Sequence, residues 1–152
     1  MSTVRVEIHI RAPIERVWET IMDPHRLGDW VTIHRSIKDV SAHPLRKGAT
    51  MDQVLAVRGV SFRVHWTLVD VSQPHRAEWD GRGRAQSRAR IRYRLTALTG
   101  KDDGSTAFEY LNEFTPPGGL LGSVASRVIV GAASEREART SLKRLKALLE
   151  RN

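Results

Sequence analysis

Large aromatic side chains recur at every second position in several short apolar segments of this chain. Successive side chains of a β-strand point to opposite faces, so such residues should share the inner face of a sheet with their apolar neighbours. Rings of this kind can line a site for an apolar molecule, and Tyr or Asn side chains can supply its few polar contacts. The predicted lining residues on strands are Phe62, Trp66, Trp79, Tyr93, Tyr110, Asn112 and Phe114. Strand parity also predicts that Val60 faces inward.

The same residues would also suit an ordinary hydrophobic core, because aromatic side chains are often buried for packing alone. Small side chains favour the binding hypothesis, since Ala77, Ala89 and Thr106 alternate with the rings and would leave space between them. Trp18, in contrast, lies in a helical pattern and is predicted to be a packing residue.

Acid–base catalysis on a carbon acid needs a general base and a donor for the developing enolate oxygen. The predicted inner face contains no Asp, Glu or His. Two residues outside that set are candidates: Asp29, which precedes Trp30, and His34, which stands near the start of a predicted strand. Burial of Asp29 would raise its pKa. The sequence leaves open whether any reaction is catalysed, and the prediction leans toward a protein that is not an enzyme.

Metal and cofactor chemistry has little support in the sequence. The chain has no cysteine, which excludes disulfides and thiolate ligands, and no pair of His or acidic residues stands at ligand spacing. Nucleotide-binding and nucleophile-elbow motifs are also missing. We therefore predict no metal and no cofactor.

The chain is basic, with 25 Lys and Arg against 17 Asp and Glu, a net charge of +8. Arg88, Arg90, Arg92 and Arg94 alternate along one predicted strand, and such a row could contact nucleic acid or an anionic membrane. Acidic residues on the neighbouring strands favour a ladder that neutralises itself instead. These acidic residues are Glu78, Asp80, Glu109 and Glu113. The remaining positive charge is expected on the last helix.

These residues must be positioned by one domain, residues 1–152, since 152 residues suit a single core. Clean apolar alternation predicts a strand over 3–11, and the i, i+3, i+4, i+7 spacing that starts at Ile14 predicts a short helix after Pro13. A second short helix is expected over 24–29. Six further strands are predicted at 33–40, 50–58, 60–71, 76–82, 85–99 and 105–115, and a long helix at 120–150.

This order predicts an α+β fold in which a curved seven-stranded antiparallel sheet wraps around the C-terminal helix. Two short helices after the first strand would close one end. Trp30 follows them and is a candidate gate, and Val124 and Val128 of the apolar helical stripe complete the predicted lining.

The element order and the run Ala12-Pro13, Val17-Trp18, Ile21, Asp23-Pro24 and Trp30 resemble the START-like (SRPBCC) superfamily. This helix-grip superfamily includes the polyketide cyclase/dehydrase and lipid-transport family. The resemblance covers nearly the whole chain, is specific for the fold, and implies a cavity for apolar ligands without naming one.

Three functions follow as hypotheses. The first is binding or transport of a small hydrophobic or aromatic ligand, lipid-like or polyketide-like. The second is a polyketide cyclase or dehydratase that uses Asp29, His34, Tyr93 or Tyr110 as acid and base. The third is a basic interaction module for RNA, a ribosome or anionic lipid.

The sequence shows no secretion signal or membrane span, so a cytoplasmic location is expected. Ligand identity and oligomeric state stay open.

Overall fold

The computed structural model describes residues 2–57, 59–115 and 124–151, with the side chains of residues 2 and 124–134 outside the description. Strand β1 (Ser2–Ile10) leads into α1 (Ile14–Ile21), the 3₁₀ turn η1 (Pro24–Arg26) and α2 (Leu27–Trp30). The strands that follow are β2 (His34–Lys38), β3 (Thr50–Val57), β4 (Val60–Ser72), β5 (Arg76–Arg82), β6 (Arg88–Ala97) and β7 (Thr106–Thr115), and α3 (Val124–Glu150) comes last.

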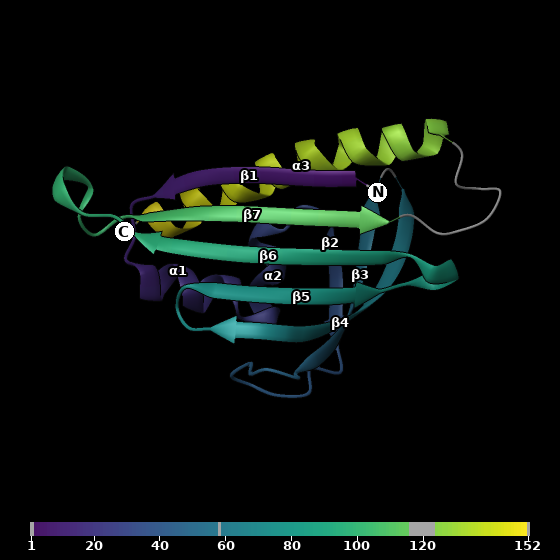
Figure 1. Cartoon of the computed structure of the whole chain (residues 1–152), viewed down its shortest axis with the longest axis horizontal. Coiled ribbons are helices and arrows are strands. Elements are labelled where there is room, and N and C mark those ends of the chain that lie inside the picture. Colours follow the sequence, from purple (N-terminus) through teal and green to yellow (C-terminus); the bar gives the residue numbers. More distant parts are fainter. Residues whose placement is uncertain (1, 58, 116–123, 152) are drawn as a thin grey trace.

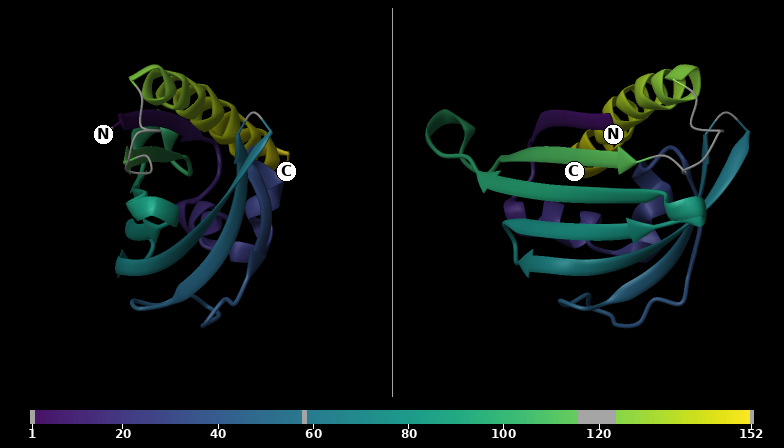
Figure 2. Two further views of the ribbon diagram at one scale, coloured as in Figure 1. Left: turned by 90° about the vertical axis from the view of Figure 1, so that its right-hand side faces the viewer. Right: turned by 45° about the vertical axis from the view of Figure 1, so that its right-hand side comes forward.

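The seven strands form one antiparallel sheet in the order β1-β7-β6-β5-β4-β3-β2. The sheet curls into a half-barrel, and α3 crosses its open side diagonally (Figures 1 and 2). Helices α1 and α2 lie behind the sheet, α1 near one end and α2 behind its middle (Figure 1). The predicted α+β helix-grip architecture is therefore confirmed.

The alternation of apolar and polar side chains in β1 gives this strand one buried face and one exposed face. Val4, Val6 and Ile10 are buried and Ile8 on the same face is half-buried, whereas Arg5, Glu7 and His9 between them are exposed. β1 pairs along its whole length with β7. Helix α3 packs against β1, so one edge of the sheet has a helical neighbour.

The core is densest at the end of the half-barrel where α1 lies. Ile10 of β1, Leu95 of β6 and Phe108 of β7 have essentially no exposed surface there. Leu142 and Leu145 of α3 are buried with them. α1 adds the stripe Ile14, Val17, Trp18 and Ile21, as its spacing predicts. The packing role predicted for Trp18 agrees with its burial.

Two details of the prediction were wrong. Val60 was expected to face inward, yet it is 55% exposed, because residues 60–64 of β4 pair with β3 beyond the point where β5 begins to pair. The predicted strand 85–99 starts only at Arg88. A 3₁₀ turn, η2 (Arg84–Gln86), precedes it, with Ala85 at a φ of 51°. This tight turn joins β5 to β6 within a few residues.

Candidate functional site

The inner face of the sheet carries a connected group of aromatic rings. Tyr93 of β6 stands at the centre, with ring centroids 5.4 Å from Phe108, 6.2 Å from Tyr110 and 6.4 Å from Trp30. The first contact is edge-to-face, a favoured arrangement for aromatic pairs. Trp30 comes from α2, so this group joins the helical end of the half-barrel to the middle of the sheet.

The predicted lining residues differ in burial along the sheet. Trp30, Trp66, Trp79 and Tyr93 are buried. Toward the other end, the residues on the same face are only half-buried. They are Phe62, Tyr110, Asn112 and Phe114, together with Val64, Ala89 and Ile91. The inner face is thus fully packed at one end and accessible at the other. Val124 and Val128 lie outside the described side chains.

The close approach of Trp66 to the backbone of β5 depends on Gly81. A Cβ atom at residue 81 would stand 2.6 Å from Cζ3 of Trp66 and 2.8 Å from Cγ1 of Val64. Such distances are far below van der Waals contact. The missing side chain of Gly81 therefore leaves the space that the indole of Trp66 occupies.

Two buried polar atoms have no hydrogen-bond partner among the described residues: Nε1 of Trp30 and Oδ1 of Asn112. A buried donor or acceptor without a partner costs about 1–3 kcal/mol. One atom is a donor and the other an acceptor, and both belong to the predicted lining. They are positions at which a bound molecule or a water could complete the hydrogen bonding.

A chain of hydrogen bonds joins three strands beside the aromatic group. Trp66 Nε1 of β4 donates to Oε1 of Gln53 on β3 over 2.9 Å. Nε2 of Gln53 lies 2.8 Å from Nδ1 of His34 on β2. Trp66 and Gln53 are buried and His34 is half-buried. Partial burial lowers the pKa of His34 from its ordinary value of 6.5. The structure thus connects one of the candidate catalytic residues to the predicted lining.

The two tyrosines are kept in their protonated form. Burial raises the pKa of Tyr110 to about 12, although a hydrogen bond with the Asn112 side chain acts in the opposite direction. Burial, followed by the proximity of Tyr110, raises the pKa of Tyr93 well above its usual value. Both phenols can therefore donate a hydrogen bond at neutral pH, and neither can act there as a base.

Asp29, the candidate acid beside Trp30, lies at the surface, so the burial that would raise its pKa is missing. Its side chain is 54% exposed and lies 3.6 Å from Nε of Arg26, one helical turn earlier. It borders an outer hollow of about 430 Å³ with Arg144, Ala147, Leu148 and Arg151 of α3. A four-residue helix has little room to turn both Asp29 and Trp30 inward, and the larger apolar residue is the one that is buried.

Sequence reasoning missed Gln53 and the contact between Thr32 and α3. Gln53 stands two residues from the buried Met51 on a strand with an alternating pattern, so strand parity could have identified it. Thr32 donates two hydrogen bonds to residues more than 100 positions later in the sequence: its N–H donates to Ser141 Oγ over 3.0 Å, and its hydroxyl donates to Glu137. No short-range pattern signals that contact.

The arginine row on the outer face is neutralised mainly by β5. Asp80 pairs with Arg82 and Arg88, and Glu78 pairs with Arg90 and Arg92, at 3.9 Å or less. Among the described residues no ion pair joins Glu109 or Glu113 to this row, although Arg94 and Arg90 stand opposite them in the sheet. The self-neutralising ladder is therefore present on the β5 side.

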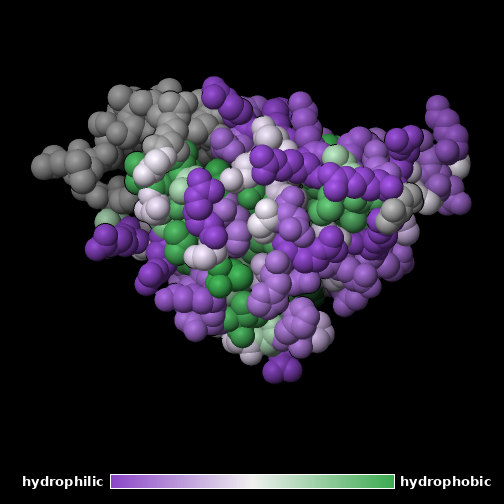
Figure 3. Space-filling model, turned by 180° about the vertical axis from the view of Figure 1, so that it is seen from behind, coloured by the Kyte–Doolittle hydropathy of each residue, from purple (hydrophilic) through white to green (hydrophobic). Residues whose placement is uncertain are grey.

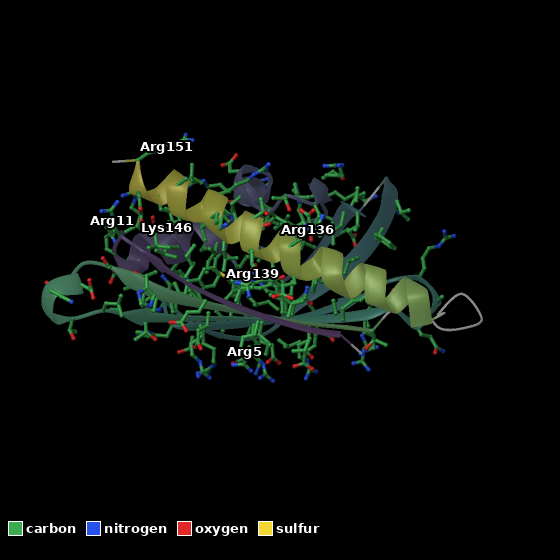
Figure 4. All side chains as sticks on the ribbon, turned by 90° about the horizontal axis from the view of Figure 1, so that it is seen from above. Arg5, Arg11, Arg136, Arg139, Lys146 and Arg151 are labelled. Carbon is green, nitrogen blue, oxygen red and sulfur yellow. The ribbon has the colours of Figure 1, made fainter. Side chains whose placement is uncertain are left out.

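Helix α3 and the edge beside it carry several cations, of which Figure 4 labels Arg5, Arg11, Arg136, Arg139, Lys146 and Arg151. Glu150 pairs with Arg11 and Lys146, and Glu135 pairs with Arg139. In the part of the chain that the structure describes, Arg136 and Arg144 have no acidic partner within 4.0 Å. Contact of this surface with nucleic acid or an anionic membrane stays a prediction.

None of the described helices combines the length and the apolar character needed to cross a bilayer. Across residues 2–57, 59–115 and 124–151, no three His, Asp or Glu side chains converge as they would around a metal ion.

Comparison with known proteins defines the class. The family described as "Polyketide cyclase / dehydrase and lipid transport" matches residues 1–150, so the chain belongs to this family. A toxin of Mycobacterium tuberculosis, Rv0910, is 26% identical over 142 residues, which cover 93% of this chain and 94% of the toxin. The uncharacterized protein Rv1546 of the same organism is 23% identical over 133 residues, 86% of this chain and 90% of that protein.

Solved structures share the fold. TTHA0849 from Thermus thermophilus superposes with a TM-score of 0.74 at 19% identity, over 97% of this chain and 96% of its own. CV1439 from Chromobacterium violaceum superposes with a TM-score of 0.71 at 20% identity over the whole of both chains. At this identity the likeness establishes the architecture and leaves the ligand to the residues of this chain.

Proposed function

We propose that this protein binds a small hydrophobic or aromatic molecule, lipid-like or polyketide-like, between the inner face of the sheet and α3. The single observation that carries the proposal is the pair of unpartnered buried atoms, Trp30 Nε1 and Asn112 Oδ1, in a wall of aromatic side chains. A purely structural core would gain from replacing both groups by apolar ones. Membership of a family of cyclases, dehydrases and lipid-transport proteins supports the same proposal.

The gradient in burial suggests where the ligand lies. Phe62, Tyr110 and Phe114 keep accessible surface on the inner face, whereas Phe108 and Leu95 at the other end are fully buried. A ligand that covered the accessible rings would gain about 25 cal/mol for each Å² of apolar surface removed from water. The face of the protein seen from behind is mostly hydrophilic, with apolar surface in separate areas (Figure 3).

Fluorescence titration with an apolar naphthalene probe tests this proposal. The chain has four Trp, and three of them belong to the predicted lining, so a bound probe should quench their emission. Tyr110→Ala should weaken binding, since it removes an accessible ring. The matched control is Leu111→Ala on the same strand, whose side chain points to the opposite face. Equal affinity of both variants and the wild type, or no saturable binding, would refute the proposal. Native mass spectrometry of the purified protein can identify a natural ligand.

A cyclase or dehydratase is a second candidate. The observation that favours it is the presence of two protonated phenols and a histidine close to one inner face, because these groups can polarise a carbonyl oxygen. Conversion of a poly-β-ketone substrate that is lost in Tyr93→Phe, with binding retained, would support this function. Binding without conversion would favour the carrier.

A further inference from the structure

The three-residue chain Trp66–Gln53–His34 has a fixed direction. An indole nitrogen can only donate, so Oε1 of Gln53 must be the acceptor of the bond from Trp66. The amide nitrogen of Gln53 is then the atom that faces His34 Nδ1, and it too can only donate. Nδ1 of His34 must therefore accept, which leaves the ring proton on Nε2. The tautomer of His34 is thus fixed by the indole N–H of Trp66, which acts through the amide of Gln53.

Protonation of His34 would break this chain, because a protonated Nδ1 would confront the NH₂ group of Gln53. A flip of the amide would restore that bond only by turning NH₂ toward the indole N–H of Trp66, two donors in a buried place. The chain therefore holds His34 neutral, in agreement with its lowered pKa. With its Nε2 protonated, His34 can donate a hydrogen bond and cannot act as a base.

The free edge of the imidazole faces α2. Cδ2, the neighbour of Nε2 in the ring, lies 3.4 Å from the point where a Cβ would stand on Gly28, which has no side chain to fill that space. Within the described residues Nε2 has no hydrogen-bond partner. Two residues after Gly28, Trp30 carries the other unpartnered donor, its buried Nε1. The α2–β2 segment thus offers two N–H groups that the described part of the protein does not use.

We infer that the ligand is an apolar molecule with a neutral hydrogen-bond-accepting oxygen, a ketone or ester, and that His34 Nε2–H donates to this oxygen. The inference rests on the proposed function and specifies its ligand class. A neutral imidazole is suited to a neutral carbonyl, since a carboxylate or phosphate would favour the protonated ring that the Gln53 amide opposes.

Two naphthalene probes test the inference: one with a propionyl ketone and one with a propyl group in its place. The wild type should bind the ketone about tenfold more tightly than its propyl analogue, the gain of one well-placed hydrogen bond. His34→Phe should abolish this preference, so that the variant binds the ketone and the propyl probe with equal affinity. The control is His65→Phe, because His65 lies on the opposite face, bonded to Asp52; it should keep the preference.

The outcomes separate the two proposals. If neither probe binds the wild type, the proposed function fails, and this inference fails with it. If both probes bind equally, or if His34→Phe weakens both alike, the inference is overturned and the proposed function stands. Nitrogen-15 NMR of the histidine rings checks the wild type without any substitution: His34 should show a bare Nδ1 and a protonated Nε2 at pH 7. A proton on Nδ1 would overturn the inference whatever the probes do.

Discussion

Thr32 and Ser141 are 109 residues apart in sequence, and the backbone N–H of Thr32 donates to Ser141 Oγ over 3.0 Å. The hydroxyl of Thr32 also bonds with Glu137, one helical turn before Ser141. These bonds attach the link between α2 and β2 to the middle of α3. Because that link stands between Trp30 and His34, its position sets the distance between the proposed ligand donors and the helix.

Ser141→Ala should lower the free energy of unfolding by about 1 kcal/mol, because a backbone N–H in a partly buried place loses its acceptor. Urea denaturation measures the change. Thr140→Ala is the matched control, since the exposed hydroxyl of Thr140 bonds only to the Arg136 carbonyl within the same helix. An equal effect of the two substitutions would contradict the role of Ser141 in this contact.

Gly81→Ala should destabilise the protein by about 1–3 kcal/mol, because the new Cβ would overlap the Trp66 indole and the Val64 side chain. Thermal or urea unfolding gives the magnitude, and tryptophan emission reports the displaced indole. Gly28→Ala is the comparison: a Cβ there meets only Cδ2 of His34 at 3.4 Å, so its cost should be small. A tolerated Gly81→Ala with unchanged emission would show that Trp66 can move freely.

The two tyrosines of the chain, Tyr93 and Tyr110, should lose their phenolic protons only well above pH 10. Burial raises both pKa values, that of Tyr110 to about 12, above the ordinary value of 10. Stability from the protonated phenols is complete below pH 10 and is lost as pH rises above that value, since only the unfolded chain then ionises. Ultraviolet absorbance of phenolate should stay absent at pH 10.5 in the folded protein and be large in urea. Phenolate absorbance in the folded protein at that pH would contradict the burial of the two hydroxyl groups.

Acid should weaken the fold through His34. Its pKa is lowered in the folded protein, so the neutral ring stabilises the fold fully above pH 6.5, the ordinary value. Below pH 6.5 the unfolded chain binds a proton that the folded protein resists, and stability falls until the lowered folded pKa is reached. Urea unfolding at pH 7.5 and 5.5 should therefore show a smaller loss for His34→Gln than for the wild type. The same loss in both proteins would contradict the lowered pKa.

Much of the fold could be predicted from local patterns. The alternation in β1 and the helical spacing of Ile14, Val17 and Trp18 each record which side of an element is buried, and burial is what fixes these elements in place. Strand parity likewise placed Trp66, Trp79 and Tyr93 correctly in the buried interior. Parity was wrong for Val60, because burial also depends on whether a neighbouring strand extends far enough to cover the residue.

The sequence by itself determined the strand faces, the helical stripe and the arginine row with its acidic neighbours, because each depends on residues within one element or on adjacent antiparallel strands. Only the tertiary structure decided the polar contacts of the site. A register shift between His34 and Ser36 breaks the simple alternation of β2, so parity could not tell which way His34 points. The bonds from His34 to Gln53 and from Gln53 to Trp66 then exist because the curled sheet brings three strands side by side, and the exposure of Asp29 follows from the burial of Trp30 beside it.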